Sequence, residues 1–235
     1  MSLQLFVFGD TSYAQLVATY TAQDSAFDVV GFTVDKAFLK TDEIGGLPVL
    51  PFEELLNAPD QAQAVFVACG YRNMRMRASL FERIATHGFI MPNIFAPNCY
   101  VAPGASLGHN NIVMPGAVVE HNVQLGDNNI VWSNATLCHD ATFGSHNFVA
   151  ANATVGGHVR VGSRNFLGFS STIEQYRQMG DENLLGAMSF LHKDAHDHQR
   201  WLGMPAKLAG SHADAGLAVI DPSPAPVTTP DEQSQ

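Results

Sequence analysis

Large apolar residues recur at every sixth position through the middle of the chain. The run starts at Val101 and continues to Leu185 without an insertion. An amphipathic α-helix would repeat its apolar positions every 3.6 residues, so this period excludes a helix. Self-similarity at a fixed short period instead indicates a solenoid of stacked coils. The apolar positions are Val101, Leu107, Val113, Val119, Leu125, Val131, Leu137, Phe143, Val149, Val155, Val161, Leu167, Ile173, Met179 and Leu185.

Glycines add a second period of eighteen residues, so three hexads form one coil. We expect these glycines at corners, where they would take backbone angles that other residues resist. They are Gly108, Gly126, Gly144, Gly162 and Gly180. Small or polar residues that suit tight corners follow four positions after the apolar ones: Ala105, Asn111, Ala117, Asn129, Ala135, Ala141, Asn147, Ala153 and Asn165. The pattern predicts a parallel β-helix of about five coils, a triangular prism with the apolar residues inside and a rise of about 4.8 Å per coil.

The first 95 residues follow a different pattern, in which buried strands alternate with helices. The expected strands are residues 3–9, 27–35 and 64–70, and the expected helices are residues 13–22, 51–57 and 74–88. Such alternation predicts a small parallel sheet. Ligands of these sheets bind at the carboxyl ends of the strands. The substrate-binding candidates there are Gly9, Asp10, Thr11, Ser12, Asp35, Gly70 and Tyr71.

The loop after the first strand lacks the GxGxxG fingerprint of dinucleotide-binding proteins. Gly9 is followed by Asp10, Thr11 and Ser12. This absence opposes a Rossmann oxidoreductase. Hydroxyl groups at a helix start either hold a phosphate or cap the helix, and the sequence leaves both interpretations open.

The hexad run resembles the hexapeptide-repeat acyltransferases, whose prism is a left-handed β-helix. With the N-terminal part, the chain resembles bacterial sugar acyltransferases that place a nucleotide-sugar-binding domain before the prism. This group includes N-acetyltransferases of nucleotide-linked amino sugars and sialic acid O-acetyltransferases. The resemblance rests on VVGFTVD, on PVLPFEELL and on the entry into the prism from Pro92. It implies a homotrimer, with acetyl-CoA between neighbouring prisms.

The resemblance also implies a division of the chain, with an α/β Rossmann-like domain ahead of the left-handed parallel β-helix. The expected parts are a nucleotide-sugar-binding domain at 1–95, the β-helix acyltransferase domain at 96–190, a closing segment at 191–210 and a flexible tail at 211–235. The tail is rich in Pro, Ser, Thr and acidic residues, which favours flexibility.

Acyl transfer needs a base, and histidine suits that task near neutral pH. His121 and His139 are eighteen residues apart and so stack in successive coils. Asp140 follows His139, but neighbours on a strand point to opposite faces, so the two side chains pair only across a bend. The stretch 139–168 resembles the catalytic coil of the family. That resemblance implies that His139 is the general base, that Asp140 is its partner and that the N–H of Gly157 faces the thioester oxygen.

Further contacts follow from the same resemblance. The implied cofactor contacts are Gly157, Phe169, Ala187, Pro205 and Lys207, the last two within the GMPAK segment at 203–207, which also reads as an ordinary loop. The implied substrate contacts on the prism are His121, Trp132 and Asn134. Two positions depart from the pattern of many members. Trp132 replaces an asparagine, and Phe148 replaces a second histidine.

Several other side chains invite chemistry but favour simpler roles. His146 and His158 are expected at the surface or at an interface. A metal site in the cluster of His192, His196 and His198 competes with ordinary loop spacing, and we predict no metal. Cys138 precedes His139, but sequence neighbours on a strand diverge, which disfavours a covalent acyl-cysteine.

Composition and charge narrow the class of protein. The formal net charge of −10 disfavours a nucleic-acid partner, and the chain holds no apolar run of about twenty residues for a membrane span. An odd number of widely spaced cysteines and the lack of a signal peptide indicate a reducing cytoplasm.

Two classes of function stay open. The first is an acetyl-CoA-dependent N-acetyltransferase of a nucleotide-linked amino sugar, with sugar O-acetylation as its close alternative. The second is a non-catalytic trimeric scaffold or binding protein. A zinc-dependent carbonic anhydrase on the same prism fits poorly, because His139 and His146 are seven residues apart rather than in that family's spacing.

Overall fold

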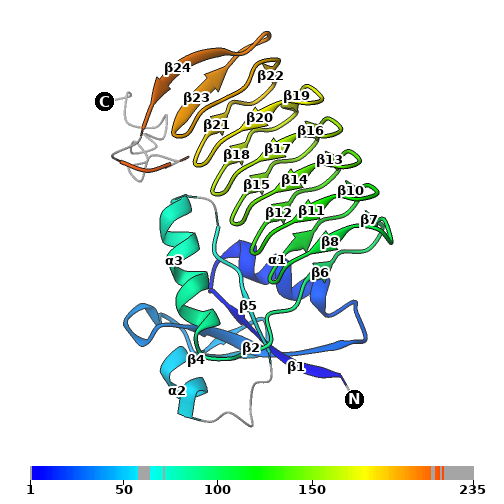
Figure 1. Ribbon diagram of the computed structural model, residues 1–235. Coiled ribbons are helices and arrows are strands. Elements are labelled where there is room, and N and C mark those ends of the chain that lie inside the picture. Colours follow the sequence, from blue (N-terminus) through cyan, green and yellow to red (C-terminus); the bar gives the residue numbers. More distant parts are fainter. Residues whose placement is uncertain (1, 58–63, 71, 213–214, 218, 220–235) are drawn as a thin grey trace, which may run out of the picture.

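The computed structural model describes residues 2–57, 64–70, 72–212, 215–217 and 219. An α/β part at the N-terminus lies against one side of a triangular prism, and the coils of the prism stack away from it (Figure 1). In the described part of the chain, no helix is both long enough and apolar enough to cross a bilayer.

The N-terminal sheet has the strand order β3-β4-β2-β1-β5. Neighbouring strands are parallel except β3, which pairs antiparallel with β4. The strands are β1 (Leu3–Phe8), β2 (Phe27–Val34), β3 (Glu43–Ile44), β4 (Leu47–Pro51) and β5 (Ala64–Val67). The helices are α1 (Ser12–Thr21), α2 (Phe52–Asn57), α3 (Met74–Ala85) and the short 3-10 turn η1 (Lys36–Phe38). The predicted strands and helices form; the hairpin of β3 and β4 was not predicted.

Three sheets of two-residue strands form the faces of the prism. The first sheet contains β6 (Ile94–Phe95), β9 (Ile112–Val113), β12 (Ile130–Val131), β15 (Phe148–Val149), β18 (Phe166–Leu167) and β21 (Leu184–Leu185), extended by β23 (Gln199–Leu202) and β24 (Lys207–Ser211). The second contains β7 (Tyr100–Val101), β10 (Val118–Val119), β13 (Thr136–Leu137), β16 (Thr154–Val155), β19 (Thr172–Ile173) and β22 (Phe190–Leu191). The third contains β8 (Ser106–Leu107), β11 (Gln124–Leu125), β14 (Thr142–Phe143), β17 (Arg160–Val161) and β20 (Gln178–Met179).

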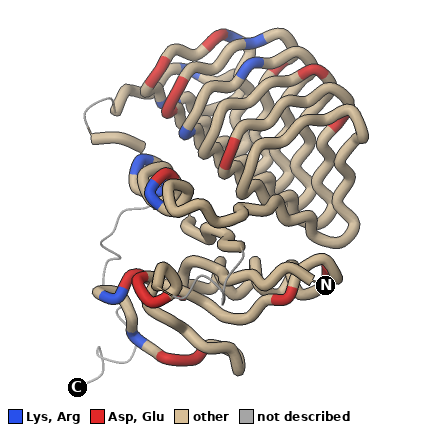
Figure 2. The backbone as a smooth tube through the Cα atoms, turned by 60° about the horizontal axis from the view of Figure 1, so that its bottom comes forward, with Lys and Arg blue, Asp and Glu red and all other residues tan. Residues whose placement is uncertain are grey.

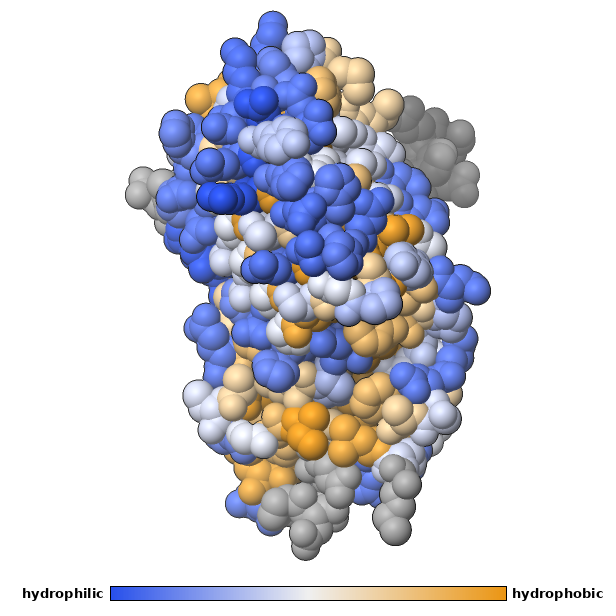
Figure 3. Space-filling model, turned by 45° about the vertical axis from the view of Figure 1, so that its right-hand side comes forward, coloured by the Kyte–Doolittle hydropathy of each residue, from blue (hydrophilic) through white to orange (hydrophobic). Residues whose placement is uncertain are grey.

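The predicted inward register is confirmed. Every predicted apolar position from Val113 to Leu185 is buried in one continuous core, and Val101 and Leu107 pack against its open end. The outward residues are polar along most of the prism, whose face is mostly hydrophilic in Figure 3. The predicted small parallel sheet followed by a left-handed parallel β-helix is therefore the fold of this chain.

The corners of the prism differ from the prediction in which residue turns the chain. From Asn110 to Met188, every sixth residue has a positive φ, and nearly all of these residues are not glycine. The periodic glycines do not adopt positive φ. A Cβ on Gly126 would lie 2.9 Å from the backbone of Gly144 in the next coil. Close stacking of coils, rather than an unusual backbone angle, therefore requires these glycines, and this part of the prediction was wrong.

Three columns of corners run along the prism, and we name each by its contents. The histidine corner joins the second sheet to the third and comprises residues 120–123, 138–141, 156–159 and 174–177. The covered corner joins the third sheet to the first and comprises residues 108–111, 126–129, 144–147, 162–165 and 180–183. The tryptophan corner joins the first sheet to the second and comprises residues 114–117, 132–135, 150–153, 168–171 and 186–189.

A ladder of buried asparagines runs inside the covered corner. Asn111 Oδ1 accepts hydrogen bonds from both the backbone N–H of Asn129 (2.8 Å) and its side-chain amide (3.1 Å). Asn147 and Asn165 repeat the arrangement in the next coils. The small or polar positions of the sequence pattern thus satisfy buried backbone groups at the corners.

The N-terminal domain docks on the covered corner through polar contacts as well as apolar ones. Asn110 exchanges hydrogen bonds with the backbone of Val67 at the end of β5 (2.8 and 3.2 Å). Arg77 of α3 is almost fully buried and donates to the carbonyl and side chain of Asn128. α3 carries three arginines, Arg75, Arg77 and Arg83, and basic positions gather on this helix in Figure 2.

A second charged contact fixes α3 farther along the prism. Arg75 donates two hydrogen bonds to the buried carboxylate of Glu182 (2.7 and 2.8 Å). Burial is the largest single effect on the pKa of Glu182 and raises it. The hydrogen bonds from Arg75 and from the backbone of Leu217, together with the charges of Arg75 and Arg164, outweigh burial and hold that pKa below its ordinary value. Leu217 is 1% exposed, and its carbonyl accepts from Met74. Part of the segment expected to be a flexible tail is therefore docked here, and most of the remainder lies outside the described residues.

Candidate active site

The histidine corner brings His139 and Asp140 together. Asp140 has a φ of 60°, which turns the chain sharply between the two side chains. His139 Nδ1 and Asp140 Oδ2 are 2.8 Å apart. The corner supplies the bend that the sequence required, because on an extended strand the two side chains would diverge.

Neighbouring coils hold Asp140 in place. The Asn122 side-chain amide donates to Asp140 Oδ1 at 3.2 Å from the coil before. The hydrogen bond from His139, followed by that from Asn122, lowers the pKa of Asp140 below its ordinary value. The carboxylate therefore stays charged at neutral pH. A charged carboxylate on Nδ1 favours the tautomer in which Nε2 of His139 is free to accept a proton.

Gly157 lies directly above His139. A Cβ at this position would come within 2.9 Å of the imidazole ring. Any side chain here would therefore displace the ring of His139. Among the predicted cofactor contacts, Gly157 is the residue that the single chain places beside the histidine.

The other predicted cofactor contacts lie elsewhere on the chain. Phe169 and Ala187 are exposed on the tryptophan corner. Pro205 and Lys207 are exposed at and beyond the turn between β23 and β24. One chain alone therefore divides the predicted cofactor contacts between two corners and the closing strands.

The predicted substrate contacts on the prism also separate. His121 is on the histidine corner, but its ring packs over Gly104 in the preceding coil. Trp132 is partly buried between Tyr13 (ring centroids 5.8 Å) and Phe148 (5.6 Å), in the layer between the prism and the N-terminal domain. Asn134 is exposed on the tryptophan corner.

Two other histidines were expected at the surface or at an interface. His146 is 6% exposed and lies against Phe81 of α3, so it is not at the surface but between the prism and the N-terminal domain. His158 Nε2 is 3.9 Å from Asp140 Oδ2, and the ring of His158 meets that of His139 edge to face at 5.3 Å. The eighteen-residue spacing from Asp140 to His158 is the signal that would have found this contact.

Burial explains the chemistry of two further groups near these corners. It lowers the pKa of His146 to about 4, with the nearby Arg77 charge adding to the effect. His146 is thus a neutral group at physiological pH. Burial raises the pKa of the Cys138 thiol, which disfavours the reactive thiolate.

A pocket of about 620 Å³ opens at the carboxyl ends of β1, β2 and β5. Of the seven residues predicted there, Gly9, Asp10, Thr11, Asp35 and Gly70 line it. Ser12 instead begins α1, and Tyr71 lies outside the described residues. The sheet therefore gathers most of the predicted residues at one edge.

Basic residues that the sequence pattern did not single out also line this pocket. Arg83 contacts both carboxylate oxygens of Asp35 (2.8 and 2.9 Å), and its guanidinium lies over the rings of Phe8 and Phe52. Lys40 lines the same pocket. Arg83 belongs to α3, and the helical pattern of the sequence does not show that its side chain extends to the strand ends that form this pocket. The pocket thus combines anionic, cationic and apolar groups, which suits a nucleotide.

Thr11 also has a structural role in this pocket. Its side chain accepts from the backbone N–H of Ala14 at 3.4 Å and so caps α1. The capping interpretation of this loop is therefore confirmed for Thr11. Thr11 also lines the pocket, so a contact between Thr11 and a ligand is compatible with its capping role.

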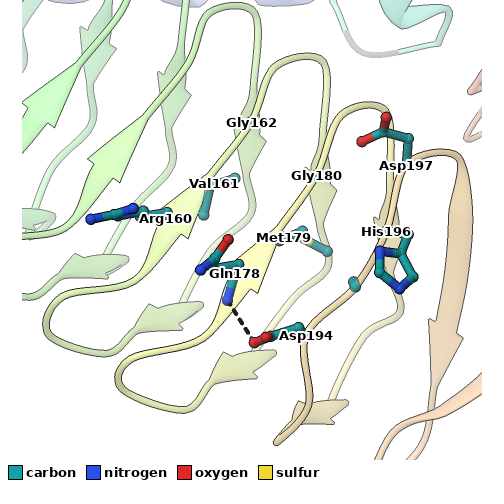
Figure 4. Close-up of a pocket in the computed structure, with 10 residues that line it drawn as sticks. Arg160, Val161, Gly162, Gln178, Met179, Gly180, Asp194, His196 and Asp197 are labelled. Carbon is teal, nitrogen blue, oxygen red and sulfur yellow. Dashed lines mark hydrogen bonds between the residues drawn. The ribbon is translucent and has the colours of Figure 1, made fainter.

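A second hollow of about 420 Å³ lies on the third sheet near the end of the prism (Figure 4). Its carboxylates are engaged by the backbone. Asp194 accepts from Gln178 N (3.0 Å), and Asp197 accepts from Asp181 N (2.7 Å). These bonds continue the coil-to-coil pattern, and none of the predicted site residues lines the hollow. We therefore assign it a structural role.

Comparison with known proteins agrees with this fold. The family model described as bacterial transferase hexapeptide (six repeats) matches residues 104–139. A search of curated proteins returned no match. The acetyltransferase domain of PglB from Neisseria gonorrhoeae FA1090, solved with acetyl coenzyme A, is 27% identical over 88% of this chain and 100% of that chain, with a TM-score of 0.79.

Two further structures share the fold at lower identity. PerB from Caulobacter crescentus, solved with CoA and GDP-perosamine, is 24% identical over 88% of this chain and 97% of that chain, with a TM-score of 0.78. WeeI from Acinetobacter baumannii AYE is 18% identical over 88% of this chain and 100% of that chain, with a TM-score of 0.77. The repeat and the fold of this chain are therefore similar to those of hexapeptide-repeat sugar acyltransferases that carry an α/β domain ahead of the prism. The chain is an acyltransferase.

Proposed function

We propose that the protein transfers an acetyl group from acetyl-CoA to the amine of a nucleotide-linked amino sugar. The observation that carries this proposal is the pair of His139 and Asp140 beneath Gly157. The likeness to the PglB acetyltransferase domain, which binds acetyl coenzyme A, supports the cofactor. The pocket at Asp35 and Arg83 supports a nucleotide on the acceptor.

His139 acts as the general base in this proposal. Its Nδ1–H donates to Asp140, so Nε2 takes the proton from the attacking amine. The amine nitrogen bonds to the thioester carbon and forms a tetrahedral oxyanion, which the N–H of Gly157 stabilises. The C–S bond then breaks, and His139 returns its proton to the CoA sulfur. Asp140 stabilises the imidazolium while it exists.

The division of cofactor contacts supports a homotrimer as part of this proposal. Phe169 and Ala187 lie on the tryptophan corner, away from the histidine corner of the same chain. In a ring of three prisms, the tryptophan corner of one chain would lie beside the histidine corner of its neighbour. Acetyl-CoA would then bind between two chains and contact both corners.

The decisive measurement is CoA release from acetyl-CoA with a panel of UDP-, dTDP- and GDP-linked amino sugars. We expect turnover with one amino sugar, a loss of roughly 100-fold or more in His139→Ala, and near wild-type turnover in His109→Ala. His109 is the control because it is an exposed histidine on the covered corner, outside the predicted contacts. Turnover with a sugar that lacks an amine would indicate O-acetylation instead. No turnover with any acceptor would favour a non-catalytic prism.

A further inference from the structure

A second imidazole converges on the carboxylate of the histidine corner. Asp140 and His158 occupy equivalent corner positions in successive coils, with φ values of 60° and 58°. The ligand atoms of His139, Asp140 and His158 all lie within 4.8 Å of one another. We propose that these three residues form a zinc-binding site and that zinc bound there inhibits the enzyme. The inhibition rests on the proposed function, whereas the binding does not.

The donor set suits zinc. Two imidazole nitrogens and one carboxylate oxygen are the protein ligands of many zinc sites, with bond lengths near 2.0–2.2 Å. His139 Nδ1 is 2.8 Å and His158 Nε2 is 3.9 Å from Asp140 Oδ2. Ligands on one tetrahedral ion lie about 3.3 Å apart by the same bond lengths, so small side-chain rotations suffice. Magnesium prefers an all-oxygen shell and does not fit this set.

The neighbouring coils hold these ligands near one another. Asn122 fixes one oxygen of Asp140. Tyr176 stacks on the ring of His158, with centroids 4.9 Å apart and planes 4° apart. The three ligand side chains are 56%, 36% and 43% exposed, in chain order. An ion therefore reaches the site from solvent and finds its ligands already oriented.

Zinc at this site stops His139 from acting as a base. When zinc binds Nδ1 of the neutral His139 ring, the ring proton resides on Nε2. Nε2 is then a hydrogen-bond donor and cannot accept the proton of the amine. When zinc takes Nε2, it occupies the base position itself. Asp140 is withdrawn from its hydrogen bond to His139 in the first case. Binding releases a proton wherever it displaces one from a ligand, so the affinity rises with pH.

Direct zinc titration of the purified full chain, against a chromophoric chelator as competitor, tests the site without any assay of turnover. We expect wild-type protein to withdraw zinc from the chelator. His158→Ala should weaken this affinity at least about tenfold, since the loss of a metal ligand's outer partner alone costs that much. His109→Ala should bind zinc as wild type does, and magnesium should not compete. Equal zinc affinity in wild type and His158→Ala would overturn the proposal.

Turnover assays separate zinc binding from catalysis. We expect zinc to inhibit wild type and His109→Ala, a chelator to restore their activity, and His158→Ala to stay active in the same zinc concentration. Zinc that inhibits His158→Ala as strongly as wild type would overturn this site. If no acceptor is turned over at all, the proposed function fails, and the chelator titration still decides the binding site.

Discussion

The histidine corner and the covered corner share one backbone plan but give their imidazoles different partners. Asp140 and His146 are successive positive-φ residues, at 60° and 66°. On the histidine corner, His139 has a charged carboxylate and solvent beside it. On the covered corner, His146 lies under α3, and its Nδ1 is 3.0 Å from the side-chain amide of Asn128.

This difference shows that the repeated fold alone does not give a histidine both a charged partner and access to solvent. The hexad repeat offers a similar corner three times in each coil. The N-terminal domain covers the corner that holds His146, and burial there keeps His146 neutral. The corner that stays open keeps both a proton acceptor and a path to it. Four predictions test this comparison, from the largest expected effect to the smallest.

The largest effect should come from the core that both corners share. Leu167→Asp places a charge at a fully buried position and should cost more than about 4 kcal/mol, so the chain should not fold. Thermal unfolding by circular dichroism measures this. Gln124→Asp, on an outward-facing position of β11, is the control and should unfold near wild type. A soluble Leu167→Asp protein with native melting would refute the inward register.

The covered corner should make the protein acid-labile through His146. Its pKa is about 4 in the folded chain and about 6.5 when unfolded. Between these values the unfolded chain binds a proton that the folded chain does not, so stability falls as the pH drops from 6.5 to 4. The free energy of unfolding falls by about 3 kcal/mol over this range, because each unit of difference between the two pKa values contributes 1.36 kcal/mol.

His146→Gln should remove this part of the pH dependence, because an amide does not titrate in that range. Urea unfolding at a series of pH values measures the effect. His139→Gln, on the histidine corner, is the matched variant and should keep the loss of stability between pH 6.5 and 4. An unchanged acid slope in His146→Gln would contradict the assignment of that slope to the covered corner.

The histidine corner should lose activity without losing stability. Asp140→Asn retains an acceptor for His139 but removes the negative charge that stabilises the imidazolium. We expect a fall in kcat of about 100-fold, near the lower end of general-base contributions, with an unchanged melting temperature. Asp127→Asn removes a carboxylate from the covered corner instead and should leave kcat unchanged. Equal activities in the two variants would break the distinction between the corners.

The smallest effect should come from Gly157. In Gly157→Ala the new methyl meets the movable ring of His139, so we expect roughly a tenfold loss of kcat through misplacement of the base and little change in stability. At Gly156 the methyl would lie 2.6 Å from the backbone of Gln175. Gly156→Ala should therefore lower the melting temperature. Reversed effects in the two variants would contradict this geometry.

The periodic part of the fold could be predicted from the sequence because one rule repeats in every hexad. An inward apolar residue at each sixth position specifies register, strand and core together, and the structure confirms this from Val113 to Leu185. The reason for the periodic glycines was wrong because close approach between coils does not show in a one-dimensional pattern. The non-glycine residues at positive φ, such as Asp140, carried no recognised signal.

The site residues that the sequence did not predict depend on contacts between elements far apart in the chain. The eighteen-residue period stacked His121 and His139 on one corner, the family resemblance paired His139 with Asp140, and strand ends placed Gly9 and Asp35 at one pocket. Arg83 reaches that pocket from a helix whose docking angle depends on the whole domain. His146 is buried because α3 covers it, and no local pattern states which corner a second domain will cover.

The contacts of Arg77 and Val67 have a consequence for the order in which the chain can mature. Both lie in the segment that leaves the ribosome first, and both are satisfied by Asn128 and Asn110, which emerge later. Until those coils assemble, the early segment holds a guanidinium and a strand end without their final partners, which is a destabilising condition. An exchange of N-terminal domains between related enzymes must therefore carry the matching asparagines of the prism, since the boundary between the two modules is a shared set of bonds.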